Sequence, residues 1–338
     1  MILPTTYFAA LLLTLVSMLC WGSWANTFKL TKGWRFELFY FDYAFGVLIA
    51  ALVVAFTFGS MGDELSFMDN LTITGKRQIA MALAAGGIFN LANMLLVAAI
   101  SLSGLSVAFP VGIGLALVIG VIWNYILRPA GNPILLFGGA AIVIAAIVVD
   151  ALAYRAHAES SKAAAAKFSA KGLVLSLVSG VLMGSFYPLV EMSREGEIGL
   201  GPYTATVIFA CGVLITTFVF NLYFMNLPVQ GEPVSFVQYF RGSGLSNHLL
   251  GLLGGVIWCV GAVTNFVASS APPDVHVSPA MSYAMGQGAT LISALWGLIV
   301  WKEFAGANGK VKMLLTVMIL LFLLGLTMVS VAPVFHNK

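Results

Sequence analysis

The sequence predicts an all-α integral membrane protein with ten transmembrane helices, arranged as two inverted five-helix repeats. The 338-residue chain is 60% hydrophobic and only 9% charged, whereas a soluble domain is about 25% charged. Ten apolar stretches approach the roughly 20 residues needed to cross a bilayer as a helix. Two of them contain related segments, Leu13 to Trp24 and Leu175 to Phe186, which are identical at six of twelve positions at a constant offset of 162.

The predicted spans fall five on each side of a linker at 154–169 that is rich in Ala, Ser and Lys. Because each half has an odd number of spans, the second copy enters the membrane from the opposite face. The predicted domains are therefore a first repeat (1–153), a cytoplasmic linker (154–169) and a second repeat (170–338). The ten spans are predicted at 6–29, 37–59, 77–101, 105–127, 133–153, 170–190, 203–226, 247–269, 276–300 and 312–333.

Weaker echoes of the duplication follow the same order along the chain. Gly86-Gly87 in the third span corresponds to Gly254-Gly255 in the eighth. Paired glycines also occur in the fourth span and the ninth span, where they allow close helix packing or bending between transport states. These pairs are Gly112 with Gly114, and Gly286 with Gly288.

The distribution of Lys and Arg predicts the orientation, because cytoplasmic loops are enriched in these residues. The joins between spans 1 and 2, 5 and 6, 7 and 8, and 9 and 10 carry eleven of the sixteen, and the opposite face carries five. We therefore expect a multi-pass protein of the plasma (cytoplasmic) membrane, the inner membrane of a cell, with both termini outside. No Lys or Arg precedes Lys29, so the first span is expected to be retained rather than cleaved as a signal peptide.

The join from Asn226 to Asn247 predicts either a short interfacial helix or an ordinary loop.

Several function classes are disfavoured by what the sequence lacks. The net charge of +3 is small and dispersed, which argues against nucleic acid as a partner. No phosphate-binding loop, metalloprotease motif or nucleophile elbow occurs, and the three cysteines and four histidines lack the spacing of a metal site. We expect neither an enzyme nor a cofactor or metal; the oligomeric state stays open.

A sparse set of polar and aromatic residues lies within the predicted spans. Polar groups in a bilayer must find partners inside the protein, so these side chains are expected to face the bundle or a water-filled cavity. Aromatic planes with amide groups suit a small, neutral, planar or ring-shaped polar solute, although Asn and Gln also serve as bridges between helices. The predicted substrate contacts are Trp21, Trp24, Asn26, Asn90, Asn93, Trp258, Asn265, Tyr283 and Gln287.

Two acidic residues are candidates for proton coupling. Asp42 lies a little over one turn inside the second span, among aromatic residues that favour its protonated form. Its alternative is an interfacial carboxylate paired with Lys29 or Arg35. Glu191 closes the sixth span, where it is either a coupling site or a charge at a helix end.

The chain resembles the drug/metabolite transporter superfamily through its five-plus-five architecture and the Trp21-Gly22-Ser23 run in the first span. It is more closely similar to the ureide permeases of plants and their bacterial relatives, neighbours of the glucose/rhamnose uptake families. The similarity extends over about residues 15–330. The motifs that carry it are Phe41-Asp42-Tyr43, Gly104-Leu105-Ser106-Val107, Val118-Ile119-Gly120, Asn124-Tyr125, Asn226-Leu227-Pro228, Trp296-Gly297 and Glu303.

This resemblance implies secondary active transport, proton-coupled, with uptake of a small neutral metabolite such as a ureide or a nucleobase. The substrate site would lie near the membrane midplane, between the two halves. The chain departs from the plant pattern in its shorter linker and in Glu191, which stands where a neutral residue is expected. Two alternatives remain open: a monosaccharide importer of the glucose/rhamnose type, and a non-transporting membrane sensor.

Overall fold

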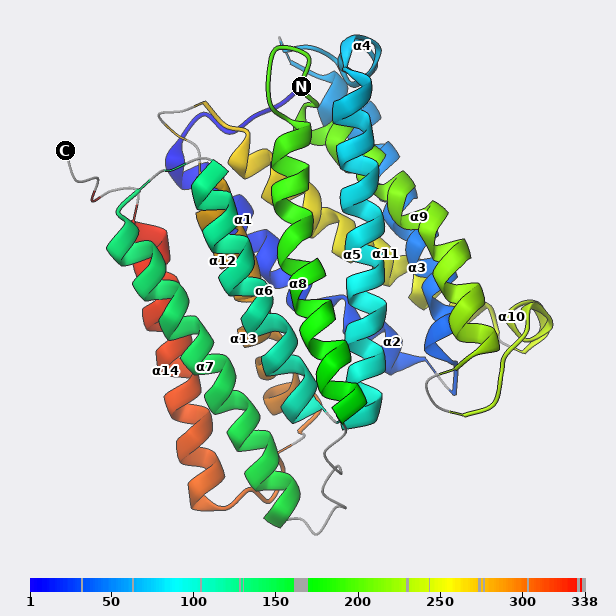
Figure 1. The fold of residues 1–338 in the computed structure, drawn as a ribbon, viewed down its shortest axis with the longest axis vertical. Helices are drawn as coiled ribbons and strands as arrows, with labels where there is room; N and C mark the ends of the chain where they lie inside the picture. The colour runs from blue at the N-terminus through cyan, green and yellow to red at the C-terminus, as the bar shows by residue number, and fades with distance from the viewer. Residues whose placement is uncertain are drawn as a thin grey trace. The chain divides into compact units, whose positions relative to one another are not determined.

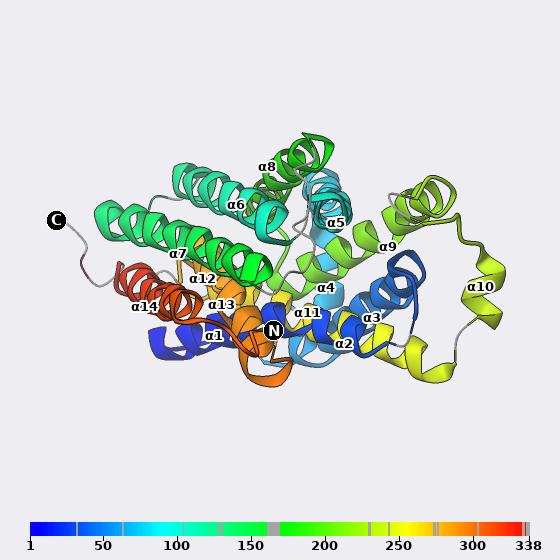
Figure 2. The same ribbon diagram turned by 90° about the horizontal axis from the view of Figure 1, so that it is seen from below.

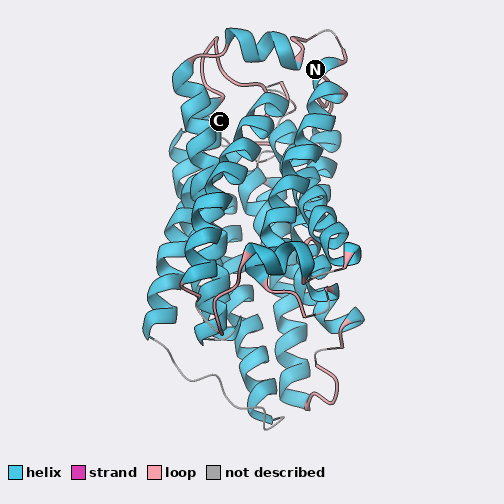
Figure 3. Ribbon diagram, turned by 90° about the vertical axis from the view of Figure 1, so that its right-hand side faces the viewer, coloured by secondary structure: helices cyan, strands magenta, loops and turns pink. Residues whose placement is uncertain are grey.

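The computed structural model describes residues 1–338 except 32, 63, 104, 128, 130, 161–169, 229–230, 243, 273–274, 276, 303, 333–334 and 336–338. Helices and the loops that join them make up the whole of this described part, with no strand (Figure 3). Polar caps begin several of the helices. The side-chain oxygens of Thr6, Ser278 and Asn308, for example, each accept a bond from a first-turn N–H.

The helices follow one another along the chain as labelled in Figure 1. Those of the first part are α1 (Tyr7–Ser23), α2 (Ala25–Leu30), α3 (Phe36–Phe56), η1 (Phe58–Ser60), α4 (Phe67–Ile73), α5 (Lys76–Ser103), α6 (Leu105–Leu127) and α7 (Pro133–Ser160). Those of the second part are α8 (Ala170–Ser193), α9 (Pro202–Asn226), α10 (Phe236–Arg241), α11 (Leu245–Ser269), α12 (Pro279–Gln287), α13 (Ala289–Leu295), η2 (Trp296–Val300) and α14 (Gly309–Val331).

The predicted spans correspond closely to these helices. Within the described residues, nine helical stretches are long and apolar enough to cross a membrane, and α6 contributes a shorter apolar stretch, Val111–Leu127. The first span is interrupted at Trp24, between α1 and α2, and the ninth at Gly288, between α12 and α13. The chain is therefore a multi-pass, all-helical membrane protein.

Two further segments differ from or sharpen the predictions. Helix α7 continues to Ser160 and so includes the beginning of the predicted linker, whose remaining residues, 161–169, lie outside the described part. The long join before α11 contains the short helix α10, which confirms a helix rather than an ordinary loop. Its capping box, formed by Ser235 and Gln238, explains why so short a helix begins there.

The helices form two compact units. Unit 1 contains Met1–Leu91 and Phe186–Val277, and unit 2 contains Ala92–Ser185 and Ser278–Lys338. Each unit thus combines spans from both halves of the sequence, and α5 and α8 each contribute to both units. The units differ from the predicted sequence halves because spans from one half pack against spans from the other.

Unit 1 is built around α11, which packs against both α3 and α1 (Figures 1 and 2). Helices α3 and α11 approach so closely that glycine is required at two positions. A Cβ on Gly46 would meet the backbone carbonyl of Leu252, and a Cβ on Gly255 would meet the carbonyl of Tyr43. Small residues at such crossings let helix backbones pack directly on each other in a membrane.

The same arrangement occurs a second time in unit 1, between α5 and α9. A Cβ on Gly86 would meet the carbonyl of Phe209, and a Cβ on Gly212 would meet the carbonyl of Leu83. In both pairs each glycine faces the carbonyl three residues before the other glycine. The two crossings therefore have the same local geometry.

Unit 2 has its own close crossing. Helices α7 and α14 lie side by side along their length (Figures 1 and 2). A Cβ on Gly139 would lie 2.8 Å from the carbonyl oxygen of Gly325, and a Cβ on Gly325 would lie 2.8 Å from that of Gly139. Helix α12 packs on α6 in the same unit.

Gly255→Ala should destabilise the protein strongly, because the added methyl group can be accommodated only if α3 and α11 move apart. Overpacking costs about 1–3 kcal/mol even where neighbours adjust, and here the obstacle is backbone. Thermal unfolding of the purified protein in detergent measures the effect.

Gly114→Ala is the matched control, since a Cβ there has nothing within 4 Å. A melting temperature for Gly255→Ala equal to that of Gly114→Ala would contradict the close crossing.

Candidate functional site

An aromatic cluster occupies the interior of unit 1 around Trp258 of α11. The rings of Trp21 and Trp258 stack at a centroid distance of 5.9 Å, and Phe209 stacks on Trp258 at 5.7 Å. Phe89 lies 4.5 Å from Trp258 and also contacts Phe186. Two of the predicted substrate contacts, Trp21 and Trp258, are thus in direct contact, and Trp21 Nε1 donates to the carbonyl of Trp258.

Three of the predicted amide side chains also lie in unit 1. Asn90, fully buried, donates through Nδ2 to the hydroxyls of Thr216 and Thr217, whereas its Oδ1 has no partner among the described residues. Asn265, also fully buried, donates to Ser17 of α1 at 3.1 Å. Asn26 donates to the carbonyl three residues before it, as a local cap would. Asn90 therefore retains a buried acceptor that a bound solute could use.

Trp24, at the interruption of the first span, packs against Tyr43 of α3 at 4.8 Å. The hydroxyl of Tyr43 is buried and has no hydrogen-bond partner among the described residues. Buried polar groups are nearly always paired, so a buried hydroxyl without a partner marks a place where water or a ligand is expected. Tyr43 is not among the substrate contacts predicted from the sequence, although it directly follows Asp42.

Unit 2 holds the remaining three predicted contacts, Asn93, Tyr283 and Gln287. Tyr283 is fully buried, and its hydroxyl donates to the carbonyls of Ala116 and Met183, at 3.2 and 3.1 Å. Its ring lies where a Cβ on Gly120 would be, so glycine is required at that position of α6. Asn93 is buried in α5, and Gln287 is half-buried at the last residue of α12.

Asp42 is the centre of a polar cluster at the end of unit 1 that carries α10. Its Oδ1 accepts a hydrogen bond from the hydroxyl of Tyr239 at 2.7 Å, and its Oδ2 lies 2.9 Å from Nδ1 of His248. The ring of Trp34 contacts both partners, at 4.6 Å from His248 and 6.1 Å from Tyr239. The carboxylate is only 8% exposed and the imidazole 22%.

These contacts exclude one alternative for Asp42, an ion pair with Arg35. Arg35 does not pair with Asp42; its guanidinium forms two bonds with Glu37, at 2.5 and 3.1 Å. That hydrogen bonding raises the pKa of Arg35. Burial raises the pKa of Tyr239, and the hydrogen bond and charge of Asp42 raise it further, so the phenol keeps its proton and acts as donor.

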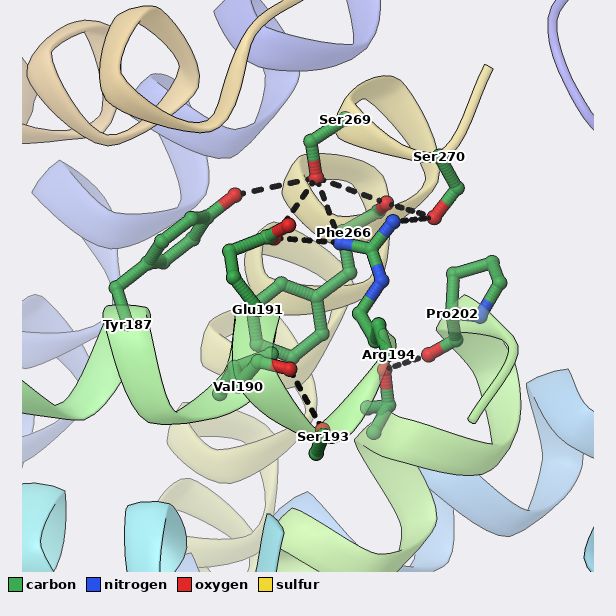
Figure 4. Close-up of polar contacts among 10 residues, drawn as sticks. Tyr187, Val190, Glu191, Ser193, Arg194, Pro202, Phe266, Ser269 and Ser270 are labelled. Atoms are coloured by element: carbon green, nitrogen blue, oxygen red, sulfur yellow. Dashed lines mark hydrogen bonds and ion pairs between the residues drawn. The ribbon is translucent and has the colours of Figure 1, made fainter. Parts of the chain in front are cut away.

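Glu191 lies at the end of α8 but is completely buried, unlike an ordinary solvated charge at a helix end. It forms an ion pair of 2.6 Å with Arg194, whose side chain is 5% exposed. Arg194 also donates to Ser269 and Ser270 at the end of α11, and Tyr187 donates to Ser269 (Figure 4). The ion pair therefore connects α8 to α11. Arg194 follows Glu191 by three positions, a spacing at which side chains on a helix can pair, and this spacing could have predicted the ion pair from the sequence.

A cavity of about 550 Å³ lies in unit 1, and none of the residues that line it belongs to the Asp42 cluster or to the Glu191 cluster. Its lining is almost wholly apolar and comes mainly from α1, the end of α3 and the second half of α11, with Leu12, Val54 and Val263 among its residues. It offers little to a polar solute. The described residues also contain no group of three His, Cys, Asp or Glu side chains that could hold a metal ion.

Comparison with known proteins finds a family model that matches part of the chain and distant relatives that match most of it. The family model described as ureide permease matches residues 39–172. Ureide permease 2 of Arabidopsis thaliana is 24% identical, covering 93% of this chain and 94% of its own, and ureide permease 1 of the same plant is 22% identical, covering 96% of each. A protein of known crystal structure has a similar fold, with a TM-score of 0.61 over 97% of this chain and 99% of its own at 17% identity.

Glu191→Gln should destabilise the protein by about 3–5 kcal/mol, because it leaves the buried guanidinium of Arg194 without its counter-charge. Replacing both residues, as Glu191→Gln with Arg194→Gln, should recover part of this loss. Unfolding of the two single variants and the double variant measures the coupling.

The exposed pair Arg155 and Glu159 of α7 is the control, since surface pairs contribute about 0.3–0.5 kcal/mol. A coupling for Glu191 and Arg194 no larger than that of this surface pair would refute the buried ion pair.

Proposed function

The chain belongs to the ureide permease family, a family of transporters rather than enzymes, and on that premise we propose proton-coupled uptake of a small neutral polar metabolite, such as a ureide or a nucleobase. The observation that carries the proposal is the similarity to plant ureide permeases over more than nine-tenths of the chain. The relatives are named ureide permeases, and we infer the substrate class of this chain from those names.

The proposed transport mechanism rests on an inverted repeat, which two sets of residues support. The glycine crossing of α3 and α11 is repeated by that of α9 and α5, with Gly46 in the place of Gly212 and Gly255 in the place of Gly86. An offset of 169, one residue more than the match of Gly86-Gly87 with Gly254-Gly255 in the sequence, relates Gly86 to Gly255. The same offset relates Phe89 to Trp258 and the first residues of α4 and α10, Phe67 and Phe236. Such repeats underlie alternating access in many secondary transporters.

We place the substrate against the aromatic and amide residues predicted from sequence. A planar solute with N–H and C=O groups suits stacking on indole rings and bonding to buried amides. In unit 1 the unpartnered Oδ1 of Asn90 supplies an acceptor and the Tyr43 hydroxyl a donor. The proposed contacts in unit 1 are Trp21, Trp24, Asn26, Asn90, Trp258 and Asn265, and those in unit 2 are Asn93, Tyr283 and Gln287.

Asp42 is proposed as the coupling carboxylate. It is buried near the end of a span, and among the described residues its two oxygens bond to Tyr239 and His248. Glu191, by contrast, is neutralised by Arg194 and serves better as a structural charge than as a proton carrier. The Lys and Arg distribution supports an orientation in which the α10 end of unit 1 faces the cytoplasm and both termini lie outside, in the plasma membrane.

Binding of allantoin or uracil to the purified protein should raise its melting temperature. A ligand that binds only the folded state stabilises it by about 2.7 kcal/mol at one hundred times its dissociation constant. Asn90→Ala should weaken binding about tenfold, the loss expected for one hydrogen bond to a buried amide.

Asn221→Ala is the matched control, because Asn221 is a buried amide of α9 that bonds to the backbone of α3 at Glu37. It should lower stability without changing affinity. A shift with monosaccharides alone would move the substrate to the sugar class, and equal affinity in the Asn90 and Asn221 variants would remove Asn90 from the site.

Asp42→Asn should abolish the dependence of uptake on a pH gradient while leaving substrate exchange at equal pH intact, since the amide cannot bind and release a proton. Proteoliposomes loaded with buffer of different pH measure both.

Glu37→Gln is the control, because Glu37 lies on the same helix but is paired with Arg35. Wild-type pH dependence in Asp42→Asn would show that another group carries the proton.

A further inference from the structure

We propose that His248 is the residue through which the proton of Asp42 exchanges with water, and that Trp34 and Tyr239 form the enclosure in which this exchange takes place. The inference rests on the proposed proton coupling and adds to it a route and new residues. Neither His248 nor Tyr239 is a candidate from the sequence, because both are about 200 positions from Asp42 along the chain.

The geometry places the imidazole between the carboxylate and the surface. Nδ1 of His248 is 2.9 Å from Oδ2 of Asp42, within hydrogen-bond distance, and the imidazole is more exposed than the carboxylate, 22% against 8%. The other carboxylate oxygen is occupied by Tyr239 at 2.7 Å. A proton that leaves Asp42 toward this end therefore meets either a phenol or an imidazole.

Only the imidazole is suited to carry that proton. Burial and the neighbouring Asp42 raise the pKa of Tyr239, so its phenol holds its proton at neutral pH. An imidazole has two nitrogens, so it can accept a proton at one and release a proton at the other. His248 presents one nitrogen to Asp42, and the other is left for water.

Other charged groups around the cluster do not replace this role. The guanidinium of Arg35 is bound by Glu37 and donates to the backbone carbonyl of Glu232. Arg241 of α10 and Lys29 of α2 have exposed side chains. Among the described residues, Tyr239 and His248 are the partners of the Asp42 carboxylate.

The relay balances in both directions. When Asp42 is protonated, Oδ2 gives its proton to Nδ1 while Nε2–H releases one to water, and the imidazole ends in the Nδ1–H tautomer bonded to the carboxylate. Uptake reverses this, since water protonates Nε2 and the Nδ1 proton passes to Oδ2. Each step leaves a neutral imidazole and moves one proton.

A second observation points to water in this enclosure. The indole of Trp34 is 7% exposed, and its buried Nε1 has no acceptor among the described residues, although its ring contacts both His248 and Tyr239. A buried donor of this kind is normally satisfied by an ordered water. A water held there would lie beside the imidazole that must exchange protons.

The test compares His248→Gln and His248→Ala with wild type in proteoliposomes, with radiolabelled allantoin and uracil as probes. We expect pH-driven uptake to fall at least tenfold in both variants, while exchange at equal pH keeps its wild-type rate. Tens of millimolar imidazole should restore pH-driven uptake in His248→Ala, because free imidazole can enter the vacated space and carry the proton. A merely structural role would not show this rescue.

His157→Gln, a histidine of α7 in unit 2, is the control and should transport as wild type does. Wild-type pH-driven uptake in His248→Gln, or a loss in His248→Ala that imidazole does not restore, would overturn the relay. Failure of the proposed function looks different: wild-type uptake would then be independent of pH, or absent for both probes.

Discussion

The structure of unit 1 depends on how closely α11 can approach its neighbours. Lipid tails are as apolar as leucine, so the hydrophobic effect does little to hold one spanning helix against another. Direct contact between backbones supplies the attraction, and it requires glycine at the crossing with α3. At the contact with α1 glycine makes room for a side chain instead, since a Cβ on Gly261 would lie 2.6 Å from the ring of Trp21.

This close approach gives α11 its functional role. One helix carries His248 in its first turn, Trp258 near its middle, Asn265 beyond it and Ser269 at its end. Each reaches a different partner helix or segment: α3, the aromatic cluster, α1 and α8, respectively. The proposed proton site and the buried ion pair of Glu191 therefore lie at opposite ends of one rigid element. A movement of α11 would therefore change the contacts of both sites.

The sequence was informative about helices and much less so about partners. The nine membrane-length helices of the described part and the shorter apolar stretch of α6 follow from local composition, because a bilayer imposes length and apolarity on each span separately. For the join that contains α10, the sequence left a short helix and an ordinary loop open. The partners of Asp42 come from α10 and α11, and no local pattern links them to α3. The burial of Glu191 was missed for the same reason, since Ser269 and Ser270 belong to a distant span. The compact units also escaped prediction, because they depend on which spans pack together.

None of the residues of helix α10 is fully buried, so its attachment to unit 1 is weak. A hydrogen bond to a charged acceptor contributes about 1.5–3 kcal/mol, and aromatic pairs such as Phe41 with Phe236 add about 0.5–1.5 each. A net attachment of about 3 kcal/mol corresponds to a detached population near one molecule in a hundred. The segment that covers Asp42 would then be detached in only about that fraction of the molecules, so His248 would be the route of proton exchange in all the others.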